Sequence, residues 1–159
     1  MRLTDKQTQL LEAKLDRANV KTREQAGQTL SYVDGHYVIS RLNEVFGHGA
    51  WSTSVHELSV CHSGVNEKGN HVVSYLARVV LTTHAGDMFN QTEDVGFGHG
   101  SDKRPGVAHE SAAKEAVTDA LKRCARQLGP SFGLALYDKE QKDVEDNEPK
   151  IEHGNRTGE

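Results

Sequence analysis

AHESAAKEAVTDALKRCARQL, residues 108–128, carries the strongest helical pattern in the chain. On a helical wheel of about 100° per residue, six of its apolar side chains fall within an arc of about 100°, which is wide enough to face a core. The pair Gly129-Pro130 ends the pattern, because proline cannot continue a helix. The stretch therefore predicts one long helix, with a buried stripe made by Ala113, Val117, Ala120, Leu121, Cys124 and Leu128.

Upstream of this helix, apolar and polar residues alternate with a period of two in three successive segments. These run from Trp51 toward Val60, from Val73 to Leu81 and from Phe89 to Phe97. The connections 61–70 and 83–87 are polar and contain glycine, and neither has the length or period of a helix. We therefore predict an α+β fold in which an antiparallel β-meander packs on the long helix.

Shorter elements flank this core. Residues 3–18 are typical of an amphipathic helix, and Leu30–Val33 is typical of a short strand that meets a turn. Residues 38–46 predict a second helix that stops at Gly47, because apolar residues recur there at three- and four-residue steps. Residues 132–137 predict a short apolar return after the long helix.

The length of 159 residues is that of one ordinary domain. No segment approaches the roughly 18 to 20 apolar residues of a membrane span, and the start MRLTDKQTQL lacks the apolar core of a signal peptide. Cys61 and Cys124 suit neither a disulfide framework nor a four-cysteine metal site. We expect a cytoplasmic protein that is neither secreted nor bound to a membrane.

The net charge of −4 is concentrated at the C-terminal end. Residues 138–159 hold eight of the 23 acidic and four of the 19 basic residues, so residues 1–137 carry 15 of each sign. The body is therefore neutral, and global charge excludes neither nucleic acid nor protein partners. We expect a folded domain over 1–139 and a disordered acidic tail over 140–159.

The basic residues of the long helix are the first candidate site. Lys122, Arg123 and Arg126 place three permanent donors on neighbouring positions of one face, which suits a row of phosphates or carboxylates. The alternative is a solvated last turn whose charges complement the helix dipole. Other candidates for the same surface lie on separate segments, and they are Arg23, Tyr32, Lys68, Lys103 and Arg104. Tyr32 could stack on a base or belong to the core.

Three other patterns fail as sites of chemistry. The glycine-rich stretch 96–103 has Asp102 where a phosphate-binding loop needs its second glycine, so we interpret it as a flexible loop. Glu93 and Asp94 are adjacent in a predicted strand and should point to opposite faces rather than share a metal. The nine histidines show no metal-ligand spacing. We assign no catalytic residue, metal ligand or cofactor.

Four motifs, taken together, resemble one family. They are Tyr32-Val-Asp-Gly-His36, the run Asn43-Glu-Val-Phe-Gly47 leading to Trp51, Glu93-Asp-Val-Gly-Phe-Gly98, and Lys114-Glu-Ala-Val-Thr-Asp-Ala-Leu-Lys-Arg123. In order and spacing they are similar to the Rad52 family of single-strand annealing recombination proteins, over roughly residues 3–139. The short chain looks like the phage or bacterial form of these proteins, acting in a nucleoid or in a virus-infected cytoplasm.

The resemblance implies a β-β-β-α core with flanking helices, assembled into a homo-oligomeric ring whose outer groove holds single-stranded DNA. It implies an inner DNA-binding site at the positions matching Arg23, Tyr32, Lys122, Arg123 and Arg126. It also implies a second, outer site at Lys68 and at Lys103 or Arg104, for which double-stranded DNA is a candidate ligand. A single-strand-binding protein is a candidate partner.

The function expected from this resemblance is annealing of complementary strands in homologous recombination and double-strand break repair, without ATP and without enzymatic chemistry. Two alternatives stay open on the sequence. One is a metal-dependent nuclease that uses Glu93, Asp94 or a histidine, and the other is a structural ring or adaptor that binds protein through the exposed helix face.

Overall fold

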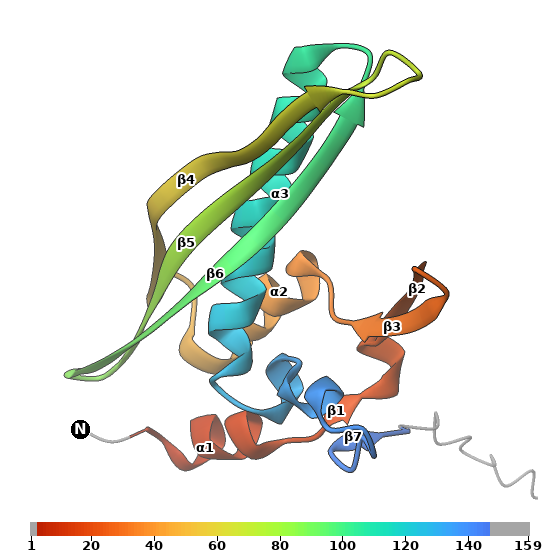
Figure 1. The fold of residues 1–159 in the computed structure, drawn as a ribbon. Helices are drawn as coiled ribbons and strands as arrows, with labels where there is room; N and C mark the ends of the chain where they lie inside the picture. The colour runs from red at the N-terminus through yellow and green to blue at the C-terminus, as the bar shows by residue number, and fades with distance from the viewer. Residues whose placement is uncertain (1–2, 147–159) are drawn as a thin grey trace, which may run out of the picture.

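The computed structural model describes residues 3–146 as an α+β fold built on a three-stranded antiparallel sheet (Figure 1). Strands β4 (Trp51–Val65), β5 (His71–Ala85) and β6 (Met88–Asp102) follow one another in the order β4-β5-β6. The predicted meander is confirmed, and each strand is longer than predicted. β4 continues through Cys61, so the connection expected over 61–70 shrinks to a turn at 66–70.

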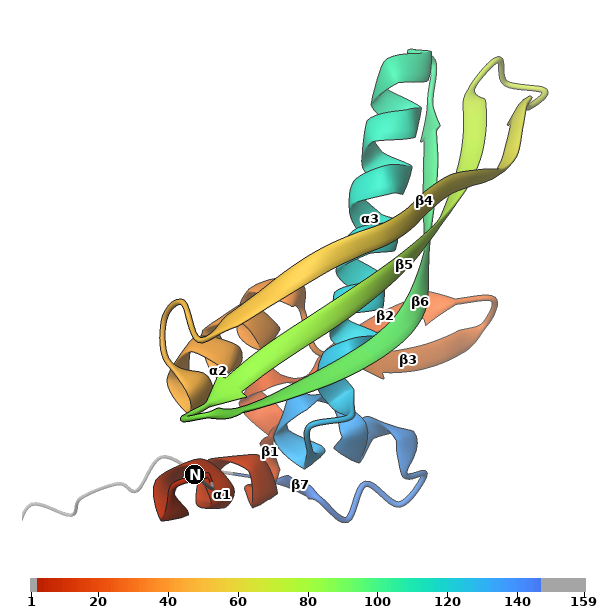
Figure 2. The same cartoon turned by 90° about the vertical axis from the view of Figure 1, so that its left-hand side faces the viewer.

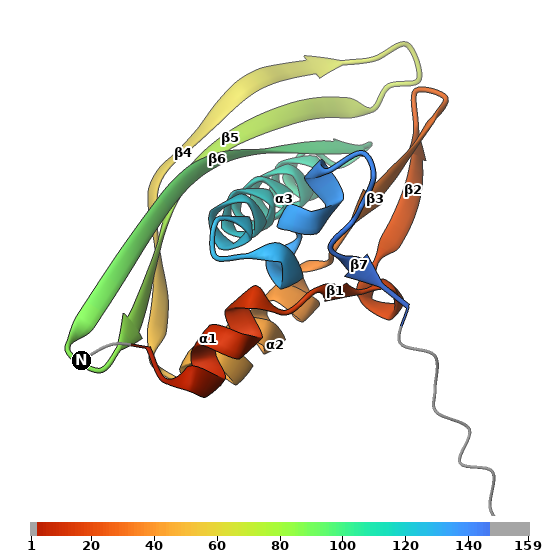
Figure 3. The same cartoon turned by 90° about the horizontal axis from the view of Figure 1, so that it is seen from below.

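Helix α3 (Pro105–Arg126) lies along the inner face of this sheet, and Figure 3 shows the sheet curving around it. The helix buries an alanine at every fourth position, namely Ala108, Ala112, Ala116 and Ala120. Opposite them, β6 has glycine at every second position, namely Gly96, Gly98 and Gly100. Four helical residues rise about 6 Å and two strand residues about 6.6 Å, so the two small-residue repeats stay in step.

One prediction about this contact was wrong, and another is confirmed only in part. The stretch 96–103, which we interpreted as a flexible loop, continues strand β6 to Asp102. The buried stripe of α3 keeps Ala120 and Cys124, but Ala113, Val117, Leu121 and Leu128 are only partly buried. The sheet contacts the alanine row instead because only glycine and alanine allow the two backbones to approach so closely.

The second predicted helix is confirmed as α2 (Gly35–Phe46), which packs beside α3. The Asp34 side chain caps its first turn by accepting a hydrogen bond of 2.8 Å from the Tyr37 backbone N–H. Gly47 ends it at a positive φ of 96°. Its buried face is made by Val38, Leu42 and Val45.

The first helix is shorter than the predicted 3–18. α1 (Asp5–Glu12) stops because Ala13 is extended, and Leu15 then pairs with Val144. This pairing joins strand β1 (Leu15–Asp16) to β7 (Val144–Glu145) in a parallel ladder, followed by the 3₁₀ turn η1 (Arg17–Asn19). Leu15 is fully buried, and burial of that side chain outweighs continuation of the helix. No helix within residues 3–146 has the length and apolar character needed to cross a bilayer.

A two-stranded hairpin, separate from the three-stranded sheet, precedes α2 (Figure 2). It consists of β2 (Lys21–Gln25) and β3 (Gln28–Tyr32), and its turn places Ala26 and Gly27 at positive φ. The strand predicted at Leu30 is present and begins earlier, at Gln28. β2 was not predicted, because all five of its residues are exposed and none is apolar.

After α3 the chain forms the 3₁₀ turns η2 (Pro130–Phe132) and η3 (Leu134–Tyr137) before β7. Phe132 is fully buried, as expected of an apolar return. The expectation of a disordered tail from residue 140 is wrong at Val144 and Glu145, which pair with β1. The rest of the expected tail, 147–159, lies outside the described residues.

Candidate nucleic-acid interface

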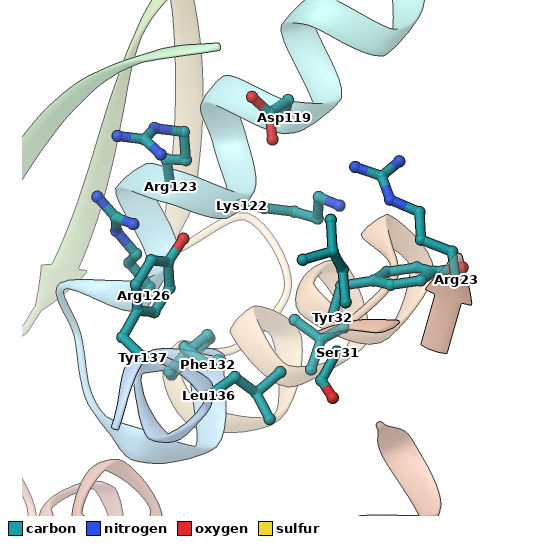
Figure 4. A pocket seen from close by; sticks show the side chains of 13 residues that line it. Arg23, Ser31, Tyr32, Asp119, Lys122, Arg123, Arg126, Phe132, Leu136 and Tyr137 are labelled. Atoms are coloured by element: carbon teal, nitrogen blue, oxygen red, sulfur yellow. The ribbon is translucent and has the colours of Figure 1, made fainter. Parts of the chain in front are cut away.

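A groove of about 340 Å³ lies where the β2–β3 hairpin, the last turns of α3 and the η2–η3 segment meet. Figure 4 shows that side chains from these three parts of the chain line it, with Arg23, Tyr32 and Lys122 toward one side and Arg123, Arg126 and Tyr137 toward the other. Four cations line it, against the single carboxylate of Asp119. All five residues proposed for the inner site, namely Arg23, Tyr32, Lys122, Arg123 and Arg126, line this one groove.

Tyr32 forms the centre of one side of the groove. The Arg23 guanidinium carbon lies 5.7 Å from its ring centroid, and the Lys122 Nζ lies 5.4 Å from it. Cations at these distances are attracted to the negative face of an aromatic ring. Tyr32 therefore fixes one cation from β2 and one from α3 beside each other, so the alternative that it is a core residue does not hold.

The base of the hairpin is tied to α2 by an ion pair between Lys21 and Asp34. A hydrogen bond and the positive charge from Lys21 hold the pKa of Asp34 below its ordinary value, and the same contact raises the pKa of Lys21. Lys21 is the register partner of Tyr32. The ion pair thus anchors the hairpin next to the aromatic ring of the groove.

Arg123 and Arg126 form the other side of the groove. Both contact Asp94 of β6, with Arg123 Nε 3.1 Å from Oδ1 and one terminal nitrogen of Arg126 3.4 Å from Oδ2. Partial burial lowers the pKa of Arg123, but the hydrogen bond and charge of Asp94 outweigh it, so the net shift is upward. Arg126 also lies over the Tyr137 ring, 4.3 Å from its centroid.

A second hollow of about 400 Å³ continues the groove along α3 toward its N-terminal end. It shares Arg23, Asp119 and Lys122 with the first, and among its added lining residues are Lys114, His99 and the acidic Glu115, so cations outnumber carboxylates over the two hollows together. Lys114 forms an ion pair with Glu110 one turn earlier on the helix. The cationic surface is therefore an elongated track rather than a single pocket.

The three residues proposed for the outer site lie at the other end of α3. Lys68 sits in the β4–β5 turn, where the Asn66 side chain accepts its backbone N–H at 3.0 Å. Lys103 and Arg104 connect β6 to α3, and Arg104 Nε lies 3.1 Å from Asp102 Oδ1. The hydrogen bond from Arg104 lowers the pKa of Asp102. The structure thus groups these residues at one end of the sheet, away from the groove.

Sequence reasoning missed Tyr137, which lines the groove, and the role of Asp94, which contacts two of its arginines from outside the lining. Tyr137 closes the predicted apolar return, and its 61% exposure, high for such a residue, appears only after folding. Asp94 was considered only as a metal ligand. The neighbouring Glu93 points to the opposite face of the strand and pairs with Arg78 at 2.8 Å. Glu93 and Asp94 therefore do not form a joint metal site, as predicted. Within residues 3–146 no group of three or more histidine, cysteine or acidic side chains could hold a metal ion.

Comparison with known proteins identifies relatives over most of the chain. Residues 4–154 match the sequence profile of the Rad52/22 family double-strand break repair protein. The chain is 35% identical over 139 residues to the DNA repair and recombination protein rti1 of Schizosaccharomyces pombe, covering 85% of this chain and 36% of that protein. It is 38% identical over 113 residues to the DNA repair and recombination protein RAD52 of Saccharomyces cerevisiae, covering 70% and 23%.

A third relative is the DNA repair and recombination protein mus-11 of Neurospora crassa, 39% identical over 124 residues that cover 72% of this chain and 19% of that protein. The chain therefore spans about a fifth to a third of the length of these curated relatives.

Proposed function

Because this chain belongs to the Rad52/22 family of double-strand break repair proteins, we propose that its groove binds single-stranded DNA and that the protein anneals complementary strands. The observation that supports this most is the convergence of Arg23, Lys122, Arg123 and Arg126 on one elongated groove. Three of these side chains come from α3 and the fourth from β2, so the fold adds a cation from a distant segment to the row on the helix.

The groove meets the physical demands of annealing. Two phosphate backbones repel each other, while the bases must stay free to test pairing. Guanidinium and ammonium groups hold phosphates without reading sequence, and they release condensed counterions as they bind. Base pairing then supplies the free energy of annealing, so the reaction needs no nucleotide hydrolysis and the protein acts without catalytic chemistry of its own.

The aromatic rings of the groove have different parts in this proposal. Tyr32 is engaged by cations from Arg23 and Lys122, so its main task is to position them. Tyr137 is 61% exposed, and it also has Arg126 over its ring. A base could therefore stack on the exposed part of Tyr137 while Arg126 holds the adjoining phosphate.

The outer residues belong to a second part of the proposal. Lys68, Lys103 and Arg104 form a separate cationic group, for which double-stranded DNA is a candidate ligand. We further propose that copies of the chain assemble into a homo-oligomeric ring, so that the grooves form one track for an extended strand. A single-strand-binding protein as partner and a cytoplasmic site of action, in a nucleoid or a phage-infected cell, stay predictions.

Annealing of two complementary dye-labelled oligonucleotides, without ATP or metal, tests the function. The intact protein should accelerate annealing, and a Lys122→Ala, Arg123→Ala, Arg126→Ala variant should not. The matched control removes three positive charges outside the groove, at Lys6, Lys14 and Arg17, and should retain the activity. In binding titrations, each lost phosphate contact should reduce the salt slope by about 0.7.

If the intact protein and the groove variant behave alike, the groove is not the DNA site. If neither accelerates annealing but labelled DNA is cut when a divalent metal is added, the nuclease alternative replaces the proposal. Absence of any affinity for single strands at low salt would favour the adaptor alternative.

A further inference from the structure

Within residues 3–146, Asp94 is the one acidic side chain that forms ion pairs with both Arg123 and Arg126, two of the three arginines of the groove. Its carboxylate is shared, with Oδ1 3.1 Å from Arg123 and Oδ2 3.4 Å from Arg126. Arg123 and Arg126 are three residues apart on α3, so one carboxylate on the neighbouring strand can reach both. The arrangement links β6 to the DNA-facing surface of the helix.

The burial of the three side chains decides what this carboxylate can do. Asp94 is 16% exposed, Arg126 is 21% exposed and Arg123 is 36% exposed, so the carboxylate is the most buried member. A ligand that approaches from solvent meets the guanidinium groups first. A guanidinium has five N–H donors, and each ion pair with Asp94 occupies one nitrogen, so donors remain for a phosphate.

We propose that Asp94 is a positioning residue that holds Arg123 and Arg126 ready to bind the phosphates of a single strand. This inference rests on the proposed function of the groove. A free arginine side chain has considerable rotamer entropy, which is lost when it is fixed against a ligand. With Asp94 in place that ordering occurs during folding, and binding is correspondingly tighter.

For Asp94→Asn, the proposal predicts a change in DNA affinity opposite in sign to the change expected from net charge alone. Asp94→Asn removes a negative charge beside the groove, and simple electrostatics would then strengthen binding to a polyanion. If positioning dominates, Asp94→Asn instead weakens binding by about fivefold, because two long side chains must be ordered when DNA binds. The sign of the effect therefore separates the two accounts.

The experiment measures fluorescence anisotropy of a dye-labelled oligodeoxythymidine with the full chain. Glu93→Gln is the matched control, since it makes the same change in charge on the adjacent residue of β6, on the opposite face, beside Arg78. We expect Glu93→Gln to bind as well as the unaltered protein or slightly better, and Asp94→Asn to bind more weakly. Equal or tighter binding by Asp94→Asn would overturn the proposal.

Two further variants separate positioning from loss of structure. In an Arg123→Ala, Arg126→Ala background, Asp94→Asn should have no further effect on affinity, because nothing remains for it to position. A full further loss in that background would overturn the proposal. Should Asp94→Asn fail to fold, Arg123→Lys tests the same claim at constant charge, because an ammonium cannot reproduce the fork that Asp94 orients. Affinity must fall there too, and unchanged affinity would overturn the proposal.

The unaltered protein separates this inference from the function on which it rests. If it does not bind the oligonucleotide, the proposed function fails and the inference fails with it. If it binds, and Asp94→Asn binds as tightly as the Glu93→Gln control, the proposed function stands and only the inference about Asp94 is overturned.

Discussion

Gly98 occupies a position where the Cβ of any other residue would lie 2.0 Å from the carbonyl oxygen of Ala112. At Gly100 the corresponding distance, to the oxygen of Ala108, is 1.9 Å. Both neighbours are backbone atoms of α3, which cannot move without shifting the whole helix. The groove depends on this contact, because it sets how close Asp94 of β6 comes to the arginines of α3.

Gly98→Ala should therefore lower the free energy of unfolding by about 3 kcal/mol or more, at the upper end of the range for overpacked cores. Chemical denaturation monitored by circular dichroism measures it. Gly106→Ala is the matched control, since a Cβ there meets no atom within 4 Å and the residue lies in the first turn of α3. It should be neutral or stabilising, because alanine favours a helix. Equal stability of the two variants would contradict the packing account.

Five residues of the groove could be named from the sequence with the help of the family resemblance, but their contacts could not. Lys122, Arg123 and Arg126 stand together in one motif, whereas Arg23 and Tyr32 come from a hairpin far away in the chain. The ring of Tyr32 meets Lys122 only after the hairpin has folded against α3. Long-range pairs of this kind leave no local period, and for the same reason the roles of Asp94 and Tyr137 were missed.

Helices and strands with a strong hydrophobic periodicity were predicted from the sequence. Strands that form only because they pair with another strand were not. The alternation of β5 follows from one buried face, and the three- and four-residue steps of α2 follow from its stripe against the core. β2 has no buried residue, and its strand form comes from pairing with β3. β7 has only two residues, and it exists because β1 offers a partner.

β7 provides a test at this scale. A chain that ends after Lys139 loses Val144, which is 9% exposed, and the backbone bond of 2.8 Å from the Leu15 N–H to the Asp143 oxygen. It also uncovers the fully buried Leu15. Burying an aliphatic side chain contributes about 2 kcal/mol, so the free energy of unfolding should fall by roughly that amount. Urea denaturation would measure the change.

A chain that ends after Asp146 keeps β7 and is the control for that truncation. It should unfold at the same urea concentration as the full chain. Equal stability of both truncations would show that β7 adds nothing to the fold and that residue 139 is the functional boundary of the domain.

The whole molecule has two sheet edges that differ in character. At the β6 edge, carboxylates of α3 accept the outward backbone N–H groups, from Phe97 to Asp119 at 3.1 Å and from His99 to Glu115 at 3.2 Å. At the β4 edge (Figure 2), three apolar side chains that pair with inward-facing residues of β5 remain about half exposed. They are Val55 at 49%, Leu58 at 46% and Val60 at 49%. Apolar side chains in such a row mark a surface that a partner covers.

Leu58→Lys should therefore break the proposed assembly of identical copies. Leu58 lies beside Ala113 and Val117 of α3, and a charge there must be desolvated at every contact of a ring, because one head-to-tail interface is repeated around it. We expect association to weaken by at least about tenfold, measured as a fall in mass by sedimentation velocity. Val95→Lys introduces the same charge on the outer face of β6, where the residue is 37% exposed, and should leave the mass unchanged. If the Leu58→Lys variant keeps the mass of the unaltered protein, the copies do not meet at β4. If the unaltered protein is itself a monomer at all concentrations, the proposed ring is wrong.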